Sequence, residues 1–251
     1  MPRTLQLPLR LQAALVEVAE LQIESLPPIQ ALRGRGVSLW EPGGREYRAD
    51  TLAFDWDRAR IEGQASLGAN PPFTLQAQAR LSARNGDGRL ADWTAEARAN
   101  GPLAAFDLQA TLRGSPRRAQ AVAPALDVDA GITPLDAWPI GRLRLRTQAL
   151  DLSALASGAP QTALSGRMDI DSRSFSGPLA ASIELDNAAP GRWNEGRVPV
   201  SRLQARLRSP DADRNRLLIE NLDLQLAHGS EAAGRWQGSG QWVGPRLQLD
   251  S

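Results

Sequence analysis

The stretch Phe106-Asp-Leu-Gln-Ala-Thr-Leu112 alternates apolar and polar residues without a break. Successive side chains of a β-strand point to opposite faces of the sheet, so this period of two predicts a strand with one apolar and one solvated face. The same alternation does not give an apolar stripe on a helix, because such a stripe needs spacings of three and four residues. Residues 106–112 therefore predict a strand that is half in contact with water.

The same period of two recurs along the chain. It is found at residues 16–18, 52–56, 73–81, 143–145, 179–185, 203–207 and 222–226. Turn-forming residues stand between these runs, as in Asn70-Pro-Pro72 and Asn100-Gly-Pro102. Short connections favour an antiparallel meander, because parallel strands need long crossovers. We therefore expect an all-β fold, an elongated antiparallel sheet.

Helical segments are expected to be short. Residues 27–32 and 151–156 each have the composition for a turn or two of helix, and Gly158 is a natural stop for the second. The strand pattern itself begins within residues 5–11 and continues to residues 247–249, and neither end resembles a polar cap. We expect one elongated unit over residues 1–251, cut from a longer protein, with a weak subdivision near residues 131–140.

Composition excludes several classes of function. The 29 basic residues, all arginine, face 28 acidic ones, and the net charge is +1. A nucleic-acid-binding protein needs a positive excess to neutralise phosphates. Without cysteine and with a single histidine, the chain has no thiol nucleophile, cysteine metal site or histidine cluster. We expect no enzyme, no cofactor, no metal and no nucleic-acid partner. No run reaches the roughly 18 apolar residues of a membrane span.

Few side chains suggest chemistry. His228 follows a predicted strand, at a turn, where a lone histidine is usually a surface residue. Aspartates two residues apart include the pairs Asp127/Asp129, Asp169/Asp171 and Asp211/Asp213. Such a pair shares one face of a strand, as in some calcium sites and glycosidases. No glycine-anchored calcium loop surrounds these pairs, so they are typical of the solvated face of a sheet.

The apolar face of the predicted strands is the one positive signal. No long helix is available to cover it, so three arrangements remain open. The face is buried against a second sheet, or the sheet folds over on itself. Alternatively it lines a cavity for an apolar ligand, such as an acyl chain. Periodicity alone does not choose among these arrangements.

Residues 150–200 carry a resemblance to a known family. A segment with leucines at 150, 152 and 155 is followed by Thr162-Ala-Leu-Ser-Gly166 and by the strand at 179–185. Asn187, Pro190-Gly191 and Pro199-Val200 then complete the order. This order resembles the TamB family of translocation and assembly module proteins, within the AsmA-like superfamily.

The resemblance implies a fold and a setting. TamB-like proteins are anchored in the inner membrane of Gram-negative bacteria by an N-terminal helix and extend across the periplasm. Their β-taco is an elongated U-shaped sheet with an apolar concave groove. They are associated with phospholipid movement to the outer membrane and with outer-membrane protein assembly alongside a barrel partner, TamA. They share no fixed catalytic residues, so none is carried over.

On this basis we expect a periplasmic segment of a lipid conduit, whose partners are phospholipid acyl chains and a TamA-like barrel. The alternative is a chaperone that receives strands of nascent outer-membrane proteins by β-augmentation. The residues expected to line the groove are Phe106, Leu108, Leu112, Leu143, Leu145, Leu179, Ile183, Leu185, Leu203, Leu207, Leu222, Leu224 and Leu226.

Overall fold

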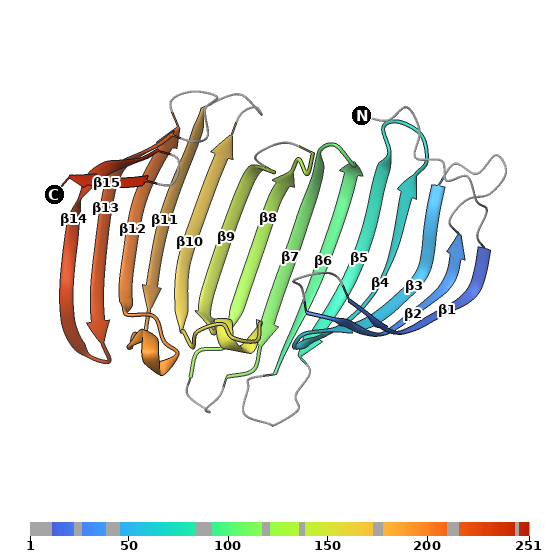
Figure 1. Ribbon diagram of the computed structural model, residues 1–251, viewed down its shortest axis with the longest axis horizontal. Coiled ribbons are helices and arrows are strands. Elements are labelled where there is room, and N and C mark those ends of the chain that lie inside the picture. Colours follow the sequence, from blue (N-terminus) through green and yellow to red (C-terminus); the bar gives the residue numbers. More distant parts are fainter. Residues whose placement is uncertain are drawn as a thin grey trace.

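The chain forms one open antiparallel sheet in which the strands follow sequence order (Figure 1). The computed structural model describes residues 12–22, 27–38, 46–83, 92–116, 121–135, 139–172, 178–209 and 216–243, and the backbone of 246–250. The strands in these residues are β1 (Gln12–Leu21), β2 (Ile29–Ser38), β3 (Glu46–Trp56), β4 (Ala59–Gly68), β5 (Thr74–Ala83), β6 (Trp93–Pro102), β7 (Phe106–Gly114), β8 (Ala125–Ile132), β9 (Ile140–Leu150), β10 (Leu164–Ser172), β11 (Leu179–Asn187), β12 (Val200–Ser209), β13 (Arg216–His228), β14 (Glu231–Val243) and β15 (Arg246–Asp250).

The expectation of an all-β, elongated and curled antiparallel sheet is confirmed. All the alternating runs from 16–18 to 222–226 fall within strands, apart from Phe73, which directly precedes β5. The two helices in the described residues are single 3₁₀ turns, η1 (Leu152–Ala154) and η2 (Trp193–Glu195). The helical turn expected at 151–156 is therefore confirmed, and Gly158 after it has a φ of 77°.

The helical turn expected at 27–32 is wrong, because β2 begins at Ile29. Ile29 and Leu32 stand three residues apart, which is the spacing of a helical stripe. In the sheet, the pairing of β2 with β3 shifts by one residue between Gln30 and Arg33, and Ala31 has a φ of 50°. This β-bulge places Ile29 and Leu32 on the same face of a strand, so a helical spacing arises from an extended backbone.

Bulges interrupt the ladder near both ends of the sheet and also at β9 in its middle, where the β8–β9 and β9–β10 pairings shift register. Register shifts interrupt the β2–β3 and β3–β4 pairings at one end, and the β12–β13 and β13–β14 pairings at the other. The pairings from β4 through β8 run without a shift. Bulges bend a strand and increase its twist, and Figure 1 shows β1–β3 sweeping across the front of the sheet. The curl is thus built from local insertions in the ladder.

The molecule has little buried core. Within the described residues, one cluster of buried apolar side chains stands out, made of Ala59, Trp93, Leu112, Leu150 and Ala154. The accessible surface is 15732 Å², against roughly 11,000 Å² for a compact protein of this mass. Within the described residues, most side chains of the apolar face are accordingly half-buried rather than enclosed.

Some expectations fall on other parts of the chain. The strand at 5–11 and the pair Asp211/Asp213 lie outside the described residues. The single unit over 1–251 and its weak subdivision near 131–140 remain predictions.

Candidate functional site

The apolar face carries a row of side chains that crosses the sheet from β1 to β14. Residues directly opposite each other in an antiparallel pair point to the same face, so the strand register traces the row. We call it the middle row, and its members are Val16, Gly34, Leu52, Gly63, Ala79, Ala97, Ala110, Val128, Leu145, Met168, Ile183, Ala205, Leu222 and Gly238. No polar side chain interrupts it.

Two parallel rows flank the middle row from β3 to β14. The lower row is Phe54, Ile61, Leu81, Ala95, Leu112, Leu126, Thr147, Gly166, Leu185, Leu203, Leu224 and Trp236. The upper row is Ala49, Ala65, Ala77, Ala99, Leu108, Ala130, Leu143, Ile170, Ala181, Leu207, Ile219 and Gly240. The one polar member, Thr147, donates its hydroxyl to the carbonyl of Ala125 at 3.2 Å.

The register brings the predicted lining residues onto this face. Ten of them belong to the three rows: Leu108, Leu112, Leu143, Leu145, Ile183, Leu185, Leu203, Leu207, Leu222 and Leu224. The other three lie nearer the strand ends, where Phe106 pairs with Ile132, Leu179 with Ser209 and Leu226 with Val200. Leu112 and Leu179 are buried, and the rest are half-buried. They share one face of the sheet with unpredicted residues of β8 and β10 between them, and that they contact a lipid remains a prediction.

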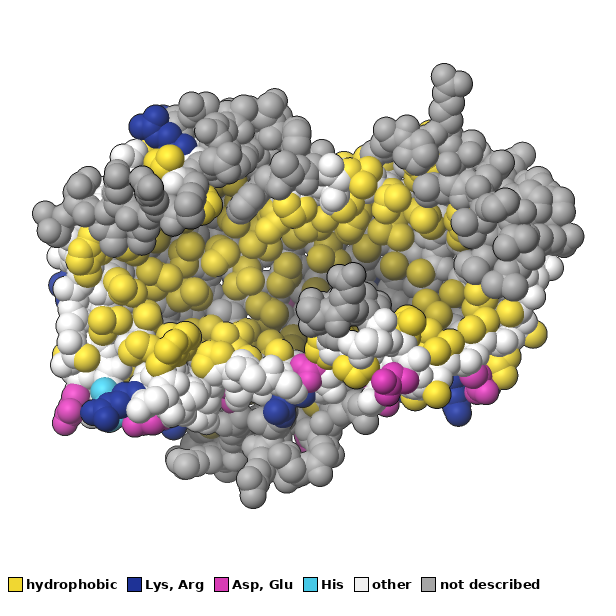
Figure 2. Space-filling view, viewed as in Figure 1, with side chains coloured by type: hydrophobic (Ala, Val, Ile, Leu, Met, Phe, Trp, Pro, Cys, Tyr) yellow, Lys and Arg dark blue, Asp and Glu magenta, His cyan; other side chains and the backbone are white. Residues whose placement is uncertain are grey.

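The wall lies in a hollow. Figure 2 shows hydrophobic side chains gathered across the recessed middle of this face, with charged side chains along its lower rim. A hollow lined by aliphatic side chains, with no unpaired polar group among the three rows, can hold a hydrocarbon chain through burial of apolar surface. The three rows themselves contain no acidic, basic or histidine side chain.

The opposite face is polar, and ion pairs join neighbouring strands across it. Arg113 on β7 lies 2.6 Å from Asp127 on β8, and Arg142 on β9 lies 2.9 Å from Asp129 on β8. Arg167 on β10 lies 2.9 Å from Glu184 on β11. Exposed pairs of this kind contribute little stability each. They keep one face solvated, and the two faces of the sheet are therefore chemically opposite.

Two carboxylates of the polar face have lowered pKa values. Arg235 donates to Asp223 through Nε at 2.9 Å and Nη2 at 2.6 Å, and Gln237 donates at 3.1 Å. The hydrogen bonds from Arg235 and Gln237 stabilise the carboxylate and hold the pKa of Asp223 below its usual value, although partial burial acts in the opposite direction. Arg167 lowers the pKa of Glu184 in the same way.

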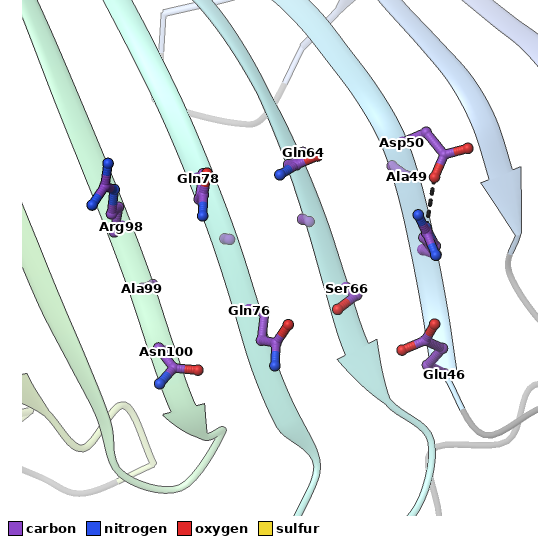
Figure 3. A pocket seen from close by; sticks show the side chains of 13 residues that line it. Glu46, Ala49, Asp50, Gln64, Ser66, Gln76, Gln78, Arg98, Ala99 and Asn100 are labelled. Atoms are coloured by element: carbon purple, nitrogen blue, oxygen red, sulfur yellow. Dashed lines mark hydrogen bonds and ion pairs between the residues drawn. The ribbon is translucent and has the colours of Figure 1, made fainter.

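A second hollow, of about 500 Å³, lies on the polar face over β3–β6 (Figure 3). Amide side chains stand at adjacent ladder positions, with Gln64 opposite Gln78 and Gln76 opposite Asn100. Arg48 is paired with Asp50 at 2.6 Å. The alternation in the sequence indicates solvated residues here. Only the strand register brings amides from three strands together, so this site is not apparent from the sequence alone.

The other candidates have ordinary places on the surface. His228 ends β13, as expected at a turn, and its Nε2 lies 3.6 Å from a carboxylate oxygen of Glu195. Asp127/Asp129 lie on the polar face of β8 and Asp169/Asp171 on that of β10. In the described part of the chain, no group of three or more His, Cys, Asp or Glu side chains is arranged to hold a metal ion.

Comparisons with protein-family models, with curated proteins and with solved structures found no match to this chain. Across the residues described, no helix has the length and apolar character needed to cross a membrane.

Proposed function

We propose that this chain is a segment of a TamB-like conduit in the periplasm, whose apolar groove carries phospholipid acyl chains between the inner and outer membranes. One observation supports this most directly, the middle row that runs from β1 to β14 without a polar side chain. A sheet stabilised only by burial would cover this face. Large exposed apolar surfaces are typical of binding sites, which supports a binding role for this groove.

The chemistry of the groove suits a lipid chain. Burying a methylene group against an apolar wall lowers the free energy by ~0.8 kcal/mol, so an acyl chain binds without any specific polar contact. A smooth aliphatic wall gives neighbouring positions similar affinity, which permits movement along the groove. The polar headgroup stays at the open mouth, in contact with water. A TamA-like barrel would receive the cargo at the outer membrane.

Ile183→Glu tests the groove, with Ser182→Glu as the matched control. The two residues are neighbours on β11, and they lie in the middle row and on the polar face respectively. Protein purified without detergent is extracted, and bound phospholipid is measured by mass spectrometry. Ile183→Glu is expected to lose most of the lipid, because an acyl chain placed against the new carboxylate would desolvate a charge, which costs free energy. Ser182→Glu is expected to keep it.

Leu224→Arg, in the lower row, is expected to behave like Ile183→Glu and to block lipid supply to the outer membrane in cells. Circular dichroism confirms that each variant keeps its strands. If folded Ile183→Glu carries as much lipid as the control, or if the unmodified protein carries none, the conduit proposal is wrong.

A role in receiving nascent strands is the second candidate. Within the described residues β1 pairs on one side only, with β2, so it is an edge strand of the kind that β-augmentation uses. A photocrosslinker at Leu15 on β1 reports peptide at this edge, and one at Ile183 reports lipid in the groove. Peptide adducts at Leu15 without lipid adducts at Ile183 would favour the chaperone.

A further inference from the structure

One segment folds over the lower rim of the groove. We call residues Leu152–Ser157 the strap; they follow β9 and contain η1, the yellow coil below β9 in Figure 1. At its base, Oδ1 of the buried Asp151 accepts from the amide and hydroxyl of Ser153 and from the amide of Thr162, at 2.8–3.1 Å. The Thr162 hydroxyl accepts from the Leu152 amide and donates to the Leu150 carbonyl, both at 3.0 Å. The base is therefore firmly held.

The strap reaches from β9 to the turn between β3 and β4. Trp93, at the start of β6, donates its indole N–H to the Ala154 carbonyl at 3.0 Å. At the tip, the Ser157 amide donates to a carboxylate oxygen of Asp57 at 2.8 Å, and the Ser157 hydroxyl donates to the other. These contacts join residues 61 and 100 positions apart in sequence. The strap thus lies across the rim between β4 and β9.

Beneath and beside the strap lies a hollow of about 180 Å³. Its wall includes Trp93, Leu112, Leu150 and Leu155, and Val122 at its edge is 56% exposed. The two polar residues in the wall are Asp151 and Thr162, whose side chains are already hydrogen-bonded to the strap base. No side chain in the described wall is left to bind a headgroup, and Leu112 also belongs to the lower row, so the hollow adjoins the groove.

We propose that this hollow is a subsite that holds the methyl end of one acyl chain, with the strap as its second wall. The proposal rests on the proposed function and adds a fixed position to a groove that otherwise allows sliding. In the open groove one side of a chain faces water, whereas here apolar side chains enclose it on more than one side, so binding is tighter. The hollow is smaller than sites for whole small ligands, so only the end of a chain fits.

The absence of cysteine makes a site-specific test direct. A bimane fluorophore is attached to Val122→Cys at the subsite, to Leu143→Cys in the open groove, or to Ser182→Cys on the polar face. Each protein is loaded with a lysophospholipid that carries a nitroxide quencher either at the methyl end of its chain or next to the headgroup. At Val122 the methyl-end quencher is expected to quench several-fold more than the headgroup-proximal one. At Leu143 the two are expected to quench about equally.

The outcomes separate the two proposals. Equal quenching by both probes at Val122, as at Leu143, would overturn the subsite and leave the conduit standing. Quenching at Val122 and Leu143 no greater than at Ser182 would overturn the conduit itself. Ala163→Leu, which adds bulk to the wall of the hollow, is expected to remove the methyl-end preference at Val122 while quenching at Leu143 persists. Persistence of that preference would also contradict the subsite.

Discussion

Gly166 shows how one residue shapes the ladder. It lies in β10 where the pairing with β9 shifts register, and its φ is 146°. A Cβ at this position would collide with the backbone carbonyl oxygen of Glu184 on β11. Only glycine adopts this backbone without strain, so the bulge, whose extra residue lies on β9 between Thr147 and Leu150, depends on the glycine that it opposes.

We expect Gly166→Ala to destabilise the protein by more than about 1 kcal/mol, because the new methyl group meets both backbone strain and a fixed carbonyl. Gly141→Ala is the control. A Cβ added at Gly141 would have the Gly131 carbonyl oxygen as its nearest neighbour, at 3.5 Å, which is an ordinary van der Waals distance. Urea unfolding followed by circular dichroism measures both. Equal midpoints for the two variants would show that the bulge does not need a glycine.

Asp223 makes stability depend on pH at the residue scale. Arg235 and Gln237 hold its pKa below the usual value. The unfolded chain therefore takes up the proton at a higher pH than the folded chain. The stabilisation is complete above the ordinary aspartate pKa of about 3.9 and is lost as the pH falls through the lower folded pKa.

We therefore expect Asp223→Asn to lower the thermal unfolding midpoint at neutral pH, with a difference from the unmodified protein that shrinks as the pH falls below about 3.9. Glu231→Gln, an exposed change in the hairpin between β13 and β14, is the control and should shift the midpoint little. A difference for Asp223→Asn that stays constant down to acid pH would contradict this assignment.

At the scale of elements, the strap and the strands beneath it form the buried cluster. Leu112 is 6% exposed and packs with Trp93, Leu150 and Ala154. Leu143 lies two strands away, on β9 in the upper row, and is only half-buried. A leucine on this face is therefore a core residue where the strap covers it, as at Leu112, and a half-exposed wall residue where the strap does not, as at Leu143.

Leu112→Ala is expected to cost about 2–5 kcal/mol, because it leaves a cavity under the strap. Leu143→Ala is expected to cost less than about 2 kcal/mol, since water reaches the vacated space and fewer methylenes are buried to begin with. Chemical unfolding of the two variants provides the comparison. Equal losses would mean that the strap does not enclose Leu112 more than the groove encloses Leu143.

At the scale of the whole molecule, each of the described strands pairs only with its neighbours in sequence among the described residues. Stability in such an array is approximately a sum of local terms, so different parts open independently. The buried cluster lies between β4 and β9, whereas β1 has exposed apolar side chains such as Leu15 and Leu21.

We expect amide hydrogen exchange to be slowest in β6 and β7, beside Trp93 and Leu112, and fastest in β1. Mass spectrometry of peptide fragments after timed exchange measures this gradient. Uniform exchange across the sheet would show a single cooperative unit instead.

The sequence by itself determined the strands and their faces, because alternation is a local property: each side chain in a strand points opposite to the one before it. It also indicated which residues share the apolar face of each strand, but that ten of the predicted wall residues fall into three rows follows from the strand register. It misread Ile29–Leu32, since the bulge at Ala31 mimics helical spacing. Register and curl were decided by hydrogen bonds between strands and by bulges.

Only the tertiary structure decided which part of the apolar face is covered. The strap meets Trp93 and Asp57, which lie 61 and 100 residues from their partners, and no local pattern encodes such distant contacts. The same holds for the amides that gather over β3–β6. Alternation specifies an apolar face, whereas its exposure depends on what folds across it.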